Sequence, residues 1–113
     1  MKTLAEREAR YQHEAPAAQL GHLASNLSRI AWLSDRPQEQ QTLLQVLRES
    51  EYFAEWTAAH WSFEVQEMLL QVQVRLAMWR RVWPRLGSQR EFCQAVAREA
   101  QQWSKRLLRN FAT

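Results

Sequence analysis

The near absence of helix-breaking residues is the feature that most restricts the fold of this chain. Its 113 residues include only two glycines and three prolines. An architecture of many short β-strands needs more turn residues than this between its strands. Ala, Leu, Gln, Glu and Arg, which favour helix, fill most of the other positions. The sequence therefore predicts an all-α protein.

Apolar residues recur every three or four positions in four separate stretches, which is the spacing of one face of a helix. These stretches predict helices over 16–33, from 38 to 56 or 57, to 83 from a start that either Thr57 or Ser62 could cap, and from 88 to 111. The residues predicted to face a common core are Leu20, Leu23, Leu27, Ile30, Leu43, Leu44, Leu47, Phe53, Ala54, Val65, Met68, Leu69, Val72, Leu76, Trp79, either Val82 or Trp83, Phe92, Val96, Ala100, Trp103, Leu107 and Phe111.

The connections between these helices are short, and short connections place consecutive helices side by side in opposite directions. We therefore predict an up-down antiparallel four-helix bundle. Two alternatives fit the same spacing. Three long helices could carry a loosely docked N-terminal helix, or two copies of the chain could complete one core between them.

The ends of the predicted helices carry recognisable signals. Ser34 or Asp35 is placed to cap the second helix. Pro84, with a glycine three residues later, ends the third helix. Ser88 and Glu91 have the spacing of a capping box, in which each side chain bonds the other residue's backbone N–H, so Ser88 is expected to begin the fourth helix.

The chain divides into a short charged segment and one domain. Residues 1–15 are charged and almost without apolar periodicity, which predicts an N-terminal tail or a frayed helix. Residues 16–113 fall within the usual size of a single domain, and we expect them to form the helical bundle.

The composition favours a soluble protein of the cytoplasm. No uncharged apolar run reaches the roughly 18 residues that a membrane-spanning helix needs. Cys93 is the only cysteine, so no disulfide can form within the chain, which fits a reducing compartment. A lone cysteine beside Phe92 is predicted to be a small core residue, although its place near a helix start also allows a reactive thiol.

Charge is distributed unevenly along the chain. Residues 1–72 hold six Lys and Arg against ten Asp and Glu, whereas residues 73–113 hold nine against two. Such a division predicts a basic face that could meet an acidic protein, a phosphate backbone or an anionic lipid surface. The opposite interpretation is that the two halves fold together and their charges largely cancel.

Enzyme chemistry finds no support in the residue patterns. The Glu-x-x-His spacing of di-metal bundles is absent at each of the three histidines. His60, Glu64 and Glu67 could share a helical face, but solvated polar residues are the favoured interpretation. With no glycine-rich phosphate loop either, we predict no catalytic residue, no cofactor and no metal site.

The most unusual local feature is a segment in which Trp and Arg alternate. Arg80, Arg81, Trp83 and Arg85 are predicted to form a basic, aromatic-edged partner surface. Two further tryptophans, Trp56 and Trp61, lie off the core stripes and are candidates for the same kind of surface.

These features predict a non-enzymatic protein–protein interaction module that binds an acidic protein partner or a second copy of itself. Nucleic-acid binding is the first alternative, because Trp can stack on bases and Arg can pair with phosphates. A small-molecule or pigment carrier is the second. It would use the aromatic cluster of Tyr52, Phe53, Trp56, Trp61 and Phe63, and it requires a pocket of at least about 300 Å³.

Two short strings resemble sequences of a known group of proteins. The strings are Leu23-Ala-Ser-Asn-Leu27-Ser-Arg-Ile30 and Phe53-Ala-Glu-Trp56-Thr57. The chain resembles small, uncharacterised all-helical proteins of cyanobacteria over about two thirds of its length. The resemblance implies a bacterial cytosolic protein, and it brings no activity, cofactor or functional residue with it.

Overall fold

The computed structural model describes residues 2–111 and, among these, the side chains of residues 2–109. This part of the chain is helical throughout, with turns between the helices and no strand, which confirms the all-α prediction. The elements are α1 (Leu4–Gln12), α2 (Pro16–Leu33), a short 3₁₀ turn η1 (Pro37–Glu39), α3 (Gln40–Ala58), α4 (Phe63–Leu86) and α5 (Arg90–Phe111). None of these helices is long and apolar enough to cross a lipid bilayer.

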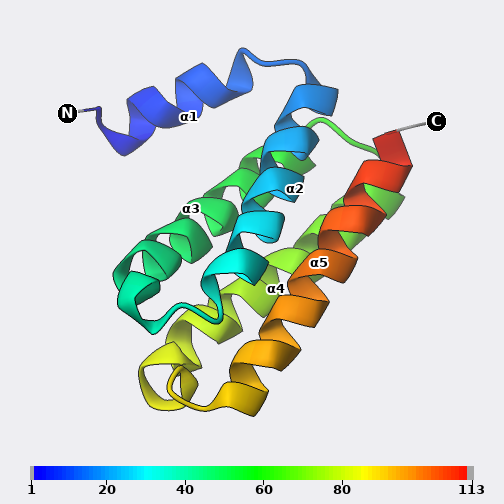
Figure 1. Cartoon of the computed structure of the whole chain (residues 1–113). Coiled ribbons are helices and arrows are strands. Elements are labelled where there is room, and N and C mark those ends of the chain that lie inside the picture. The colour runs from blue at the N-terminus through cyan, green and yellow to red at the C-terminus, as the bar shows by residue number, and fades with distance from the viewer. Residues whose placement is uncertain (1, 112–113) are drawn as a thin grey trace.

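The four long helices pack in the order α4, α3, α2, α5 (Figure 1). α2 lies along both α3 and α5, and α3 also lies along α4. The backbones of α4 and α5 approach each other far less than those of the other neighbouring pairs, so large side chains join these two helices. The molecule measures 37 × 35 × 18 Å along its principal axes. α4 thus packs closely along α3 and is joined to α5 by side chains.

The predicted apolar stripes form the core. Of the residues expected to face inward, all but a few are buried, and Trp83 is buried where the sequence left a choice between it and Val82. Leu44, Phe53, Val65 and Phe92 are partly buried and pack against the core from outside. The Phe111 side chain lies outside the described residues.

Neither of the two residues predicted to cap α3, Ser34 or Asp35, does so. The Ser34 hydroxyl donates back to the Ile30 carbonyl at 2.7 Å, within the helix that ends there, so Ser34 closes α2 instead of starting α3. Asp35 pairs with Arg36. The next segment begins with the η1 turn, whose geometry places Gln40 as the first α-helical residue. A side chain at 34 or 35 is thus too far from the free N–H groups of α3.

The α4–α5 connection also differs from its prediction. α4 continues through Pro84 to Leu86, because a proline in the last turn sacrifices only one backbone hydrogen bond. α5 begins at Arg90, with the Cys93 N–H donating to the Gln89 carbonyl at 3.1 Å. Gln89 therefore occupies the N-cap position, and the capping box predicted at Ser88 does not form.

The N-terminal segment contains a docked helix. In α1 the Thr3 hydroxyl accepts a hydrogen bond from the Glu6 N–H at 3.1 Å and caps the helix. Arg7 forms an ion pair with Glu49 of α3 at 2.8 Å, and Tyr11 is buried. Where the sequence predicted a tail or a frayed helix, residues 4–12 form a fifth helix that lies on the outside of the other four (Figure 1).

Candidate interaction surface

The six residues predicted to form one surface lie in different environments. Arg81 and Arg85 are exposed, Arg80 and Trp61 are partly buried, and Trp56 and Trp83 belong to the buried core. Trp61 precedes α4, whereas Arg81 lies 18 residues beyond the first residue of that helix. At 1.5 Å per residue this separates the two by about 27 Å. The structure therefore does not bring the six side chains together.

Arg80 is engaged within the fold. Its Nε and Nη2 atoms donate to the two carboxylate oxygens of Glu51 in α3, at 2.5 and 3.2 Å. Glu51 is only 6% exposed, and Arg48 also donates to it at 3.3 Å. The hydrogen bonds to Glu51 raise the pKa of Arg80 above its ordinary value. Arg80 thus neutralises a buried carboxylate and holds α4 against α3, because a buried charge without a partner is strongly destabilising.

Arg75 has the corresponding role toward α5. Its Nε and Nη2 atoms donate to both oxygens of Glu99, at 2.7 and 2.8 Å. The Trp103 indole N–H donates to the same carboxylate at 3.2 Å. The hydrogen bonds to Glu99 raise the pKa of Arg75. This cluster joins α4 to α5 where their backbones are far apart.

Trp83 is a core residue and supplies no surface. It is 2% exposed, and its ring centroid lies 5.1 Å from that of Phe92 at the start of α5. A Cβ atom at Gly87 would lie 2.4 Å from the Trp83 indole nitrogen. Glycine at this position therefore lets the chain turn closely over the buried indole.

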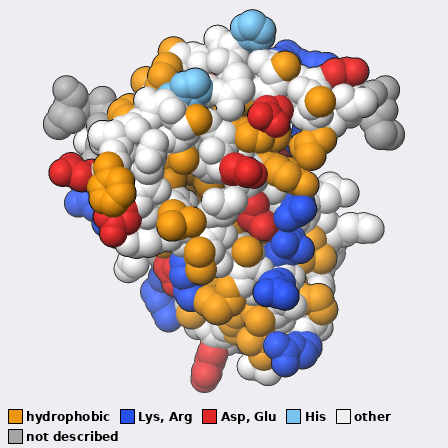
Figure 2. Space-filling view, turned by 180° about the vertical axis from the view of Figure 1, so that it is seen from behind, with side chains coloured by type: hydrophobic (Ala, Val, Ile, Leu, Met, Phe, Trp, Pro, Cys, Tyr) orange, Lys and Arg blue, Asp and Glu red, His pale blue; other side chains and the backbone are white. Residues whose placement is uncertain are grey.

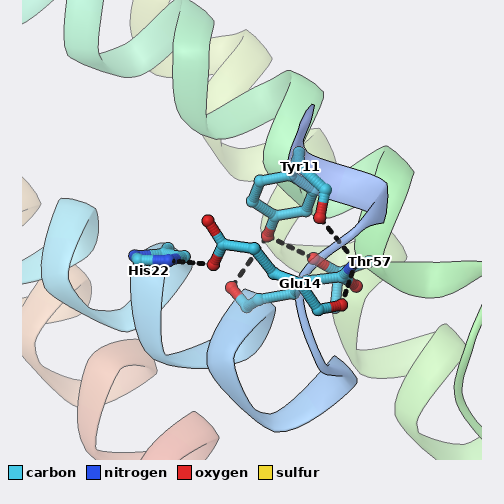
Figure 3. A network of polar contacts seen from close by, with 5 residues as sticks. Tyr11, Glu14, His22 and Thr57 are labelled. Atoms are coloured by element: carbon cyan, nitrogen blue, oxygen red, sulfur yellow. Dashed lines mark hydrogen bonds and ion pairs between the residues drawn. The ribbon is translucent and has the colours of Figure 1, made fainter. Parts of the chain in front are cut away.

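Trp56 is covered by α1. Tyr11 of α1 stacks on Phe53, with ring centroids 4.5 Å apart, and lies 5.5 Å from the Trp56 ring. The Tyr11 hydroxyl lies 2.7 Å from the Gln19 carbonyl, to which it donates, and 2.6 Å from the Thr57 hydroxyl (Figure 3). Burial raises the pKa of Tyr11 above its ordinary value. α1 thus covers the part of the aromatic cluster that Phe53 and Trp56 form.

Two polar contacts lie beside these aromatic residues, and each involves a histidine. The Glu14 carboxylate and the His22 ring are joined by a hydrogen bond beside Tyr11 (Figure 3). His60 bonds the side chain of Gln12, a residue of α1, which ties the helix to the turn before α4. The described residues contain no group of three His, Cys, Asp or Glu side chains that could hold a metal ion.

Two open hollows are large enough for a small molecule. One, of about 710 Å³, lies between α1, α2 and α3, and its lining includes Lys2, Arg7, Arg10, Glu14 and Glu49. The other, of about 750 Å³, lies beside Cys93 and its lining includes Asp35, Arg90 and Arg98. Neither hollow is lined by a tryptophan, and the first is lined by two aromatic side chains, Tyr11 and Phe53.

Cys93 itself belongs to the core, as predicted. Its side chain is buried, and its thiol lies 3.2 Å from the Gly87 carbonyl, to which it donates. Burial raises the pKa of this thiol above its ordinary value. The thiolate, which is the reactive form of cysteine, is therefore disfavoured.

Four of the seven large apolar side chains that are exposed among the described residues belong to α4. Leu70 is 59% exposed, Val74 57% and Met78 40%, and Phe63 at the start of the helix is 77% exposed. We define the outer face of α4 as Phe63, Glu67, Leu70, Val74, Ala77, Met78, Arg81 and Arg85. Figure 2 shows hydrophobic side chains gathered beside Lys and Arg side chains on the side of the molecule where α3 and α4 lie.

The outer face is hollowed at its basic end. A shallow groove of about 510 Å³ follows the second half of α4, and its lining is formed by Val74, Ala77, Met78, Arg81, Val82 and Arg85. Arg81 and Arg85 make no hydrogen bond or ion pair with any residue that the structure describes. These two arginines are the part of the predicted surface that is exposed.

Sequence reasoning did not find the apolar part of this face. The signal was present, since Leu70, Val74 and Met78 are spaced by four residues and lie outside the core stripe of the same helix. A helix with apolar residues on two opposite sides has more apolar surface than one core can cover.

The chain was compared with protein-family models, with curated proteins and with solved structures, and nothing matched it. The resemblance to helical proteins of cyanobacteria therefore stays a prediction, and the function is argued from the geometry alone.

Proposed function

We propose that this protein is a non-enzymatic protein–protein interaction module, a four-helix up-and-down bundle with α1 docked on it, whose binding surface is the outer face of α4. One observation supports this most strongly. Three large apolar side chains, Leu70, Val74 and Met78, are exposed in a row on a long helix whose opposite side is already buried. Exposed apolar patches rimmed by charged residues mark interaction sites, because covering them removes apolar surface from water.

The charges at the end of the patch indicate what the partner carries there. Arg81 and Arg85 are exposed, whereas Arg75 and Arg80 of the same helix are occupied by Glu99 and Glu51. A partner that lies along α4 meets two arginines with no ion pair inside the described fold. Side chains that pair with a guanidinium, acidic or aromatic, are therefore expected opposite them.

A photo-crosslinking experiment in the cells from which the protein comes tests this proposal. A photoreactive residue is placed at Gln71, which is exposed and flanks the apolar row without belonging to it. The matched control is the same residue at Gln101, which is exposed on α5. We expect covalent protein adducts at position 71 and few at position 101. Equal labelling at both positions, or none at position 71, contradicts the proposal.

A second candidate function, nucleic-acid binding, is favoured by one observation on α5. Arg98, Lys105 and Arg109 are all exposed, and their spacing places them on one side of that helix. A tryptophan-fluorescence titration with single-stranded RNA at two salt concentrations tests it, because release of counterions from phosphates makes such binding weaken steeply with salt. Absence of binding at low salt eliminates this function.

We also propose that the protein works in the cytoplasm. The proposal rests on the single cysteine, which is buried and cannot take part in a disulfide within the chain.

A further inference from the structure

Apart from Ala77, whose side chain is small, the members of the outer face of α4 are spaced symmetrically along the helix. Those at positions 63, 67, 70, 74, 78, 81 and 85 are separated by four, three, four, four, three and four residues. Each half covers 11 residues in three steps, or about 3.67 residues per step, which keeps the row on one side of a nearly straight helix. Val74 is the midpoint of this row.

The chemistry of the row is complementary about Val74. Glu67 and Arg81 are each seven residues from Val74, and Leu70 and Met78 are each four residues from it. If a second α4 lay antiparallel with the two Val74 residues facing each other, Glu67 of each copy would meet Arg81 of the other, and Leu70 would meet Met78. Opposite charges would pair and apolar residues would cover each other.

The ends of the row are complementary too. Phe63 and Arg85 are each 11 residues from Val74. In the antiparallel arrangement the Arg85 guanidinium of one copy meets the Phe63 ring of the other, where a cation over an aromatic face is favourable. Phe63 is 77% exposed, so it is not otherwise covered by the described residues.

Only the antiparallel orientation satisfies these charges. A parallel pairing in register would place Glu67 against Glu67 and Arg81 against Arg81, which is repulsive. Glu67, Arg81 and Arg85 are exposed and form no ion pair with any described residue. They are thus available to the second copy, whereas the arginines on the flanks of α4 are not.

We propose that the partner of this face is a second copy of the same chain, bound through an antiparallel α4–α4 contact with a two-fold axis at Val74. The inference deepens the proposed function and rests on it. A two-fold contact uses the same patch on both copies, which is the commonest arrangement among soluble oligomers.

The expected dimer is reversible. From Phe63 to Arg85 the row is about 33 Å long, and at a helix width of about 10 Å the two faces together cover on the order of 700 Å². This lies below the roughly 1,200 Å² at which stable complexes begin. We therefore expect a dissociation constant in the micromolar range or above, weakening with salt.

Sedimentation equilibrium of the full-length protein tests the proposal, with concentrations from about 10 μM to about 1 mM. The wild type is expected to rise from its monomer mass of 13.5 kDa toward twice that value. Arg81→Glu places the new carboxylate of each copy opposite Glu67 of the other copy. This repulsion occurs twice in the dimer and should raise its dissociation constant at least about tenfold. Glu67→Arg should do the same. The double variant E67R/R81E restores opposite charges and should bring the dissociation constant back to within about threefold of the wild type.

Arg98→Glu is the matched control, because it changes the net charge equally at an exposed site on α5 and should leave the dimer unaffected. All three positions changed are exposed, and circular dichroism checks that each of the four variants keeps its helix content. A wild type that stays monomeric throughout, or a double variant no better than the singles, overturns the proposal.

The two proposals fail in different ways. If the purified chain stays monomeric but position 71 crosslinks to a protein of another mass, the second copy is wrong and the interaction surface stands. If no adduct forms and the chain stays monomeric, both are wrong.

Discussion

At Gly87 the chain passes so close to the Trp83 indole that no side chain fits between them. A Cβ atom there lies 2.4 Å from the indole nitrogen and 2.6 Å from the neighbouring ring carbon. The indole is buried and cannot move aside without disturbing its packing on Phe92. The backbone at Gly87 is in the ordinary right-handed region, so this glycine is needed for space.

Gly87→Ala is therefore expected to lower the free energy of unfolding by about 1–3 kcal/mol, the usual cost of forcing extra atoms into a packed region. Urea unfolding followed by circular dichroism measures it. Ser88→Ala is the matched control. Ser88 is exposed and forms no cap, so its change should remain within about 0.5 kcal/mol. If the Ser88 variant were as destabilised as the Gly87 variant, the Ser88 hydroxyl would cap α5 after all, which would contradict the α4–α5 turn described above.

Tyr11 couples the stability of the fold to alkaline pH. Burial raises its pKa above the ordinary value of 10.0, so the folded state holds the phenol proton more tightly than the unfolded state does. The stabilisation from this group is thus complete below pH 10.0 and is lost as the pH rises beyond that value. Deprotonation would leave a phenolate close to the Gln19 carbonyl, which can only accept a hydrogen bond.

Tyr11→Phe keeps the ring and removes the hydroxyl, so it should cost about 1–2 kcal/mol at neutral pH, because the buried Thr57 hydroxyl loses its partner. The difference in unfolding free energy between wild type and variant should then shrink between about pH 8 and about pH 11. Chemical unfolding at both pH values measures this difference. Tyr52 is present in both proteins, so its contribution cancels in the difference between their unfolding free energies. A constant difference across this range would show that Tyr11 does not titrate as described.

At the scale of the helix, α4 performs two tasks on opposite sides. Its inner side contributes Val72, Leu76 and Trp79 to the core. Its flanks are fastened by Arg80 to α3 and by Arg75 to α5. Only the outer face is without a neighbour in the described fold, which is why the arginines of one helix have such different environments.

Arg80→Ala should destabilise the protein by about 1–3 kcal/mol, because it leaves the carboxylate of Glu51 nearly buried with only the weaker Arg48 contact. Arg81→Ala, which removes an equal side chain one residue later, should change stability by less than about 0.5 kcal/mol. Thermal unfolding of the two variants at low protein concentration compares them. Equal losses would mean that the Arg80–Glu51 pair contributes nothing particular to the fold.

The sequence predicted the inner side of each helix well and the ends less well. The spacing of residues such as Leu23, Leu27, Leu69 and Leu76 requires one buried stripe per helix, and the structure buries all four. The caps failed because a hydroxyl such as that of Ser34 can bond the helix behind it as easily as the helix ahead. Spacing along the chain does not decide between the two.

At the scale of the whole molecule, α1 was the least predictable element. Its residues are mostly exposed, and only Tyr11 among them is buried, so no stripe marks it in the sequence. Docking depends on long-range partners, including Glu49 for Arg7 and Thr57 for Tyr11. The same docking covers Trp56, which explains why a tryptophan predicted to lie on the surface belongs to the core.

Only part of the predicted interaction surface is exposed, because contacts between distant parts of the chain again decide which side chains are buried. Arg81 and Arg85 are exposed as expected, but the fold occupies Arg80 with Glu51 across the α3–α4 contact, a pairing between residues 29 positions apart. The packing of α4 along α3, together with the side chains that join α4 to α5, decides which side of α4 stays open.

We propose above all that this protein binds a second copy of itself through the outer face of α4. Amide chemical shifts of the ¹⁵N-labelled full-length protein, recorded by NMR from about 20 μM to about 1 mM, test this claim residue by residue. We predict concentration-dependent shifts confined to α4, strongest around Leu70, Val74, Ala77 and Met78, with α2 and α5 unchanged. Spectra that do not change with concentration, or shifts that centre on another helix, would contradict it.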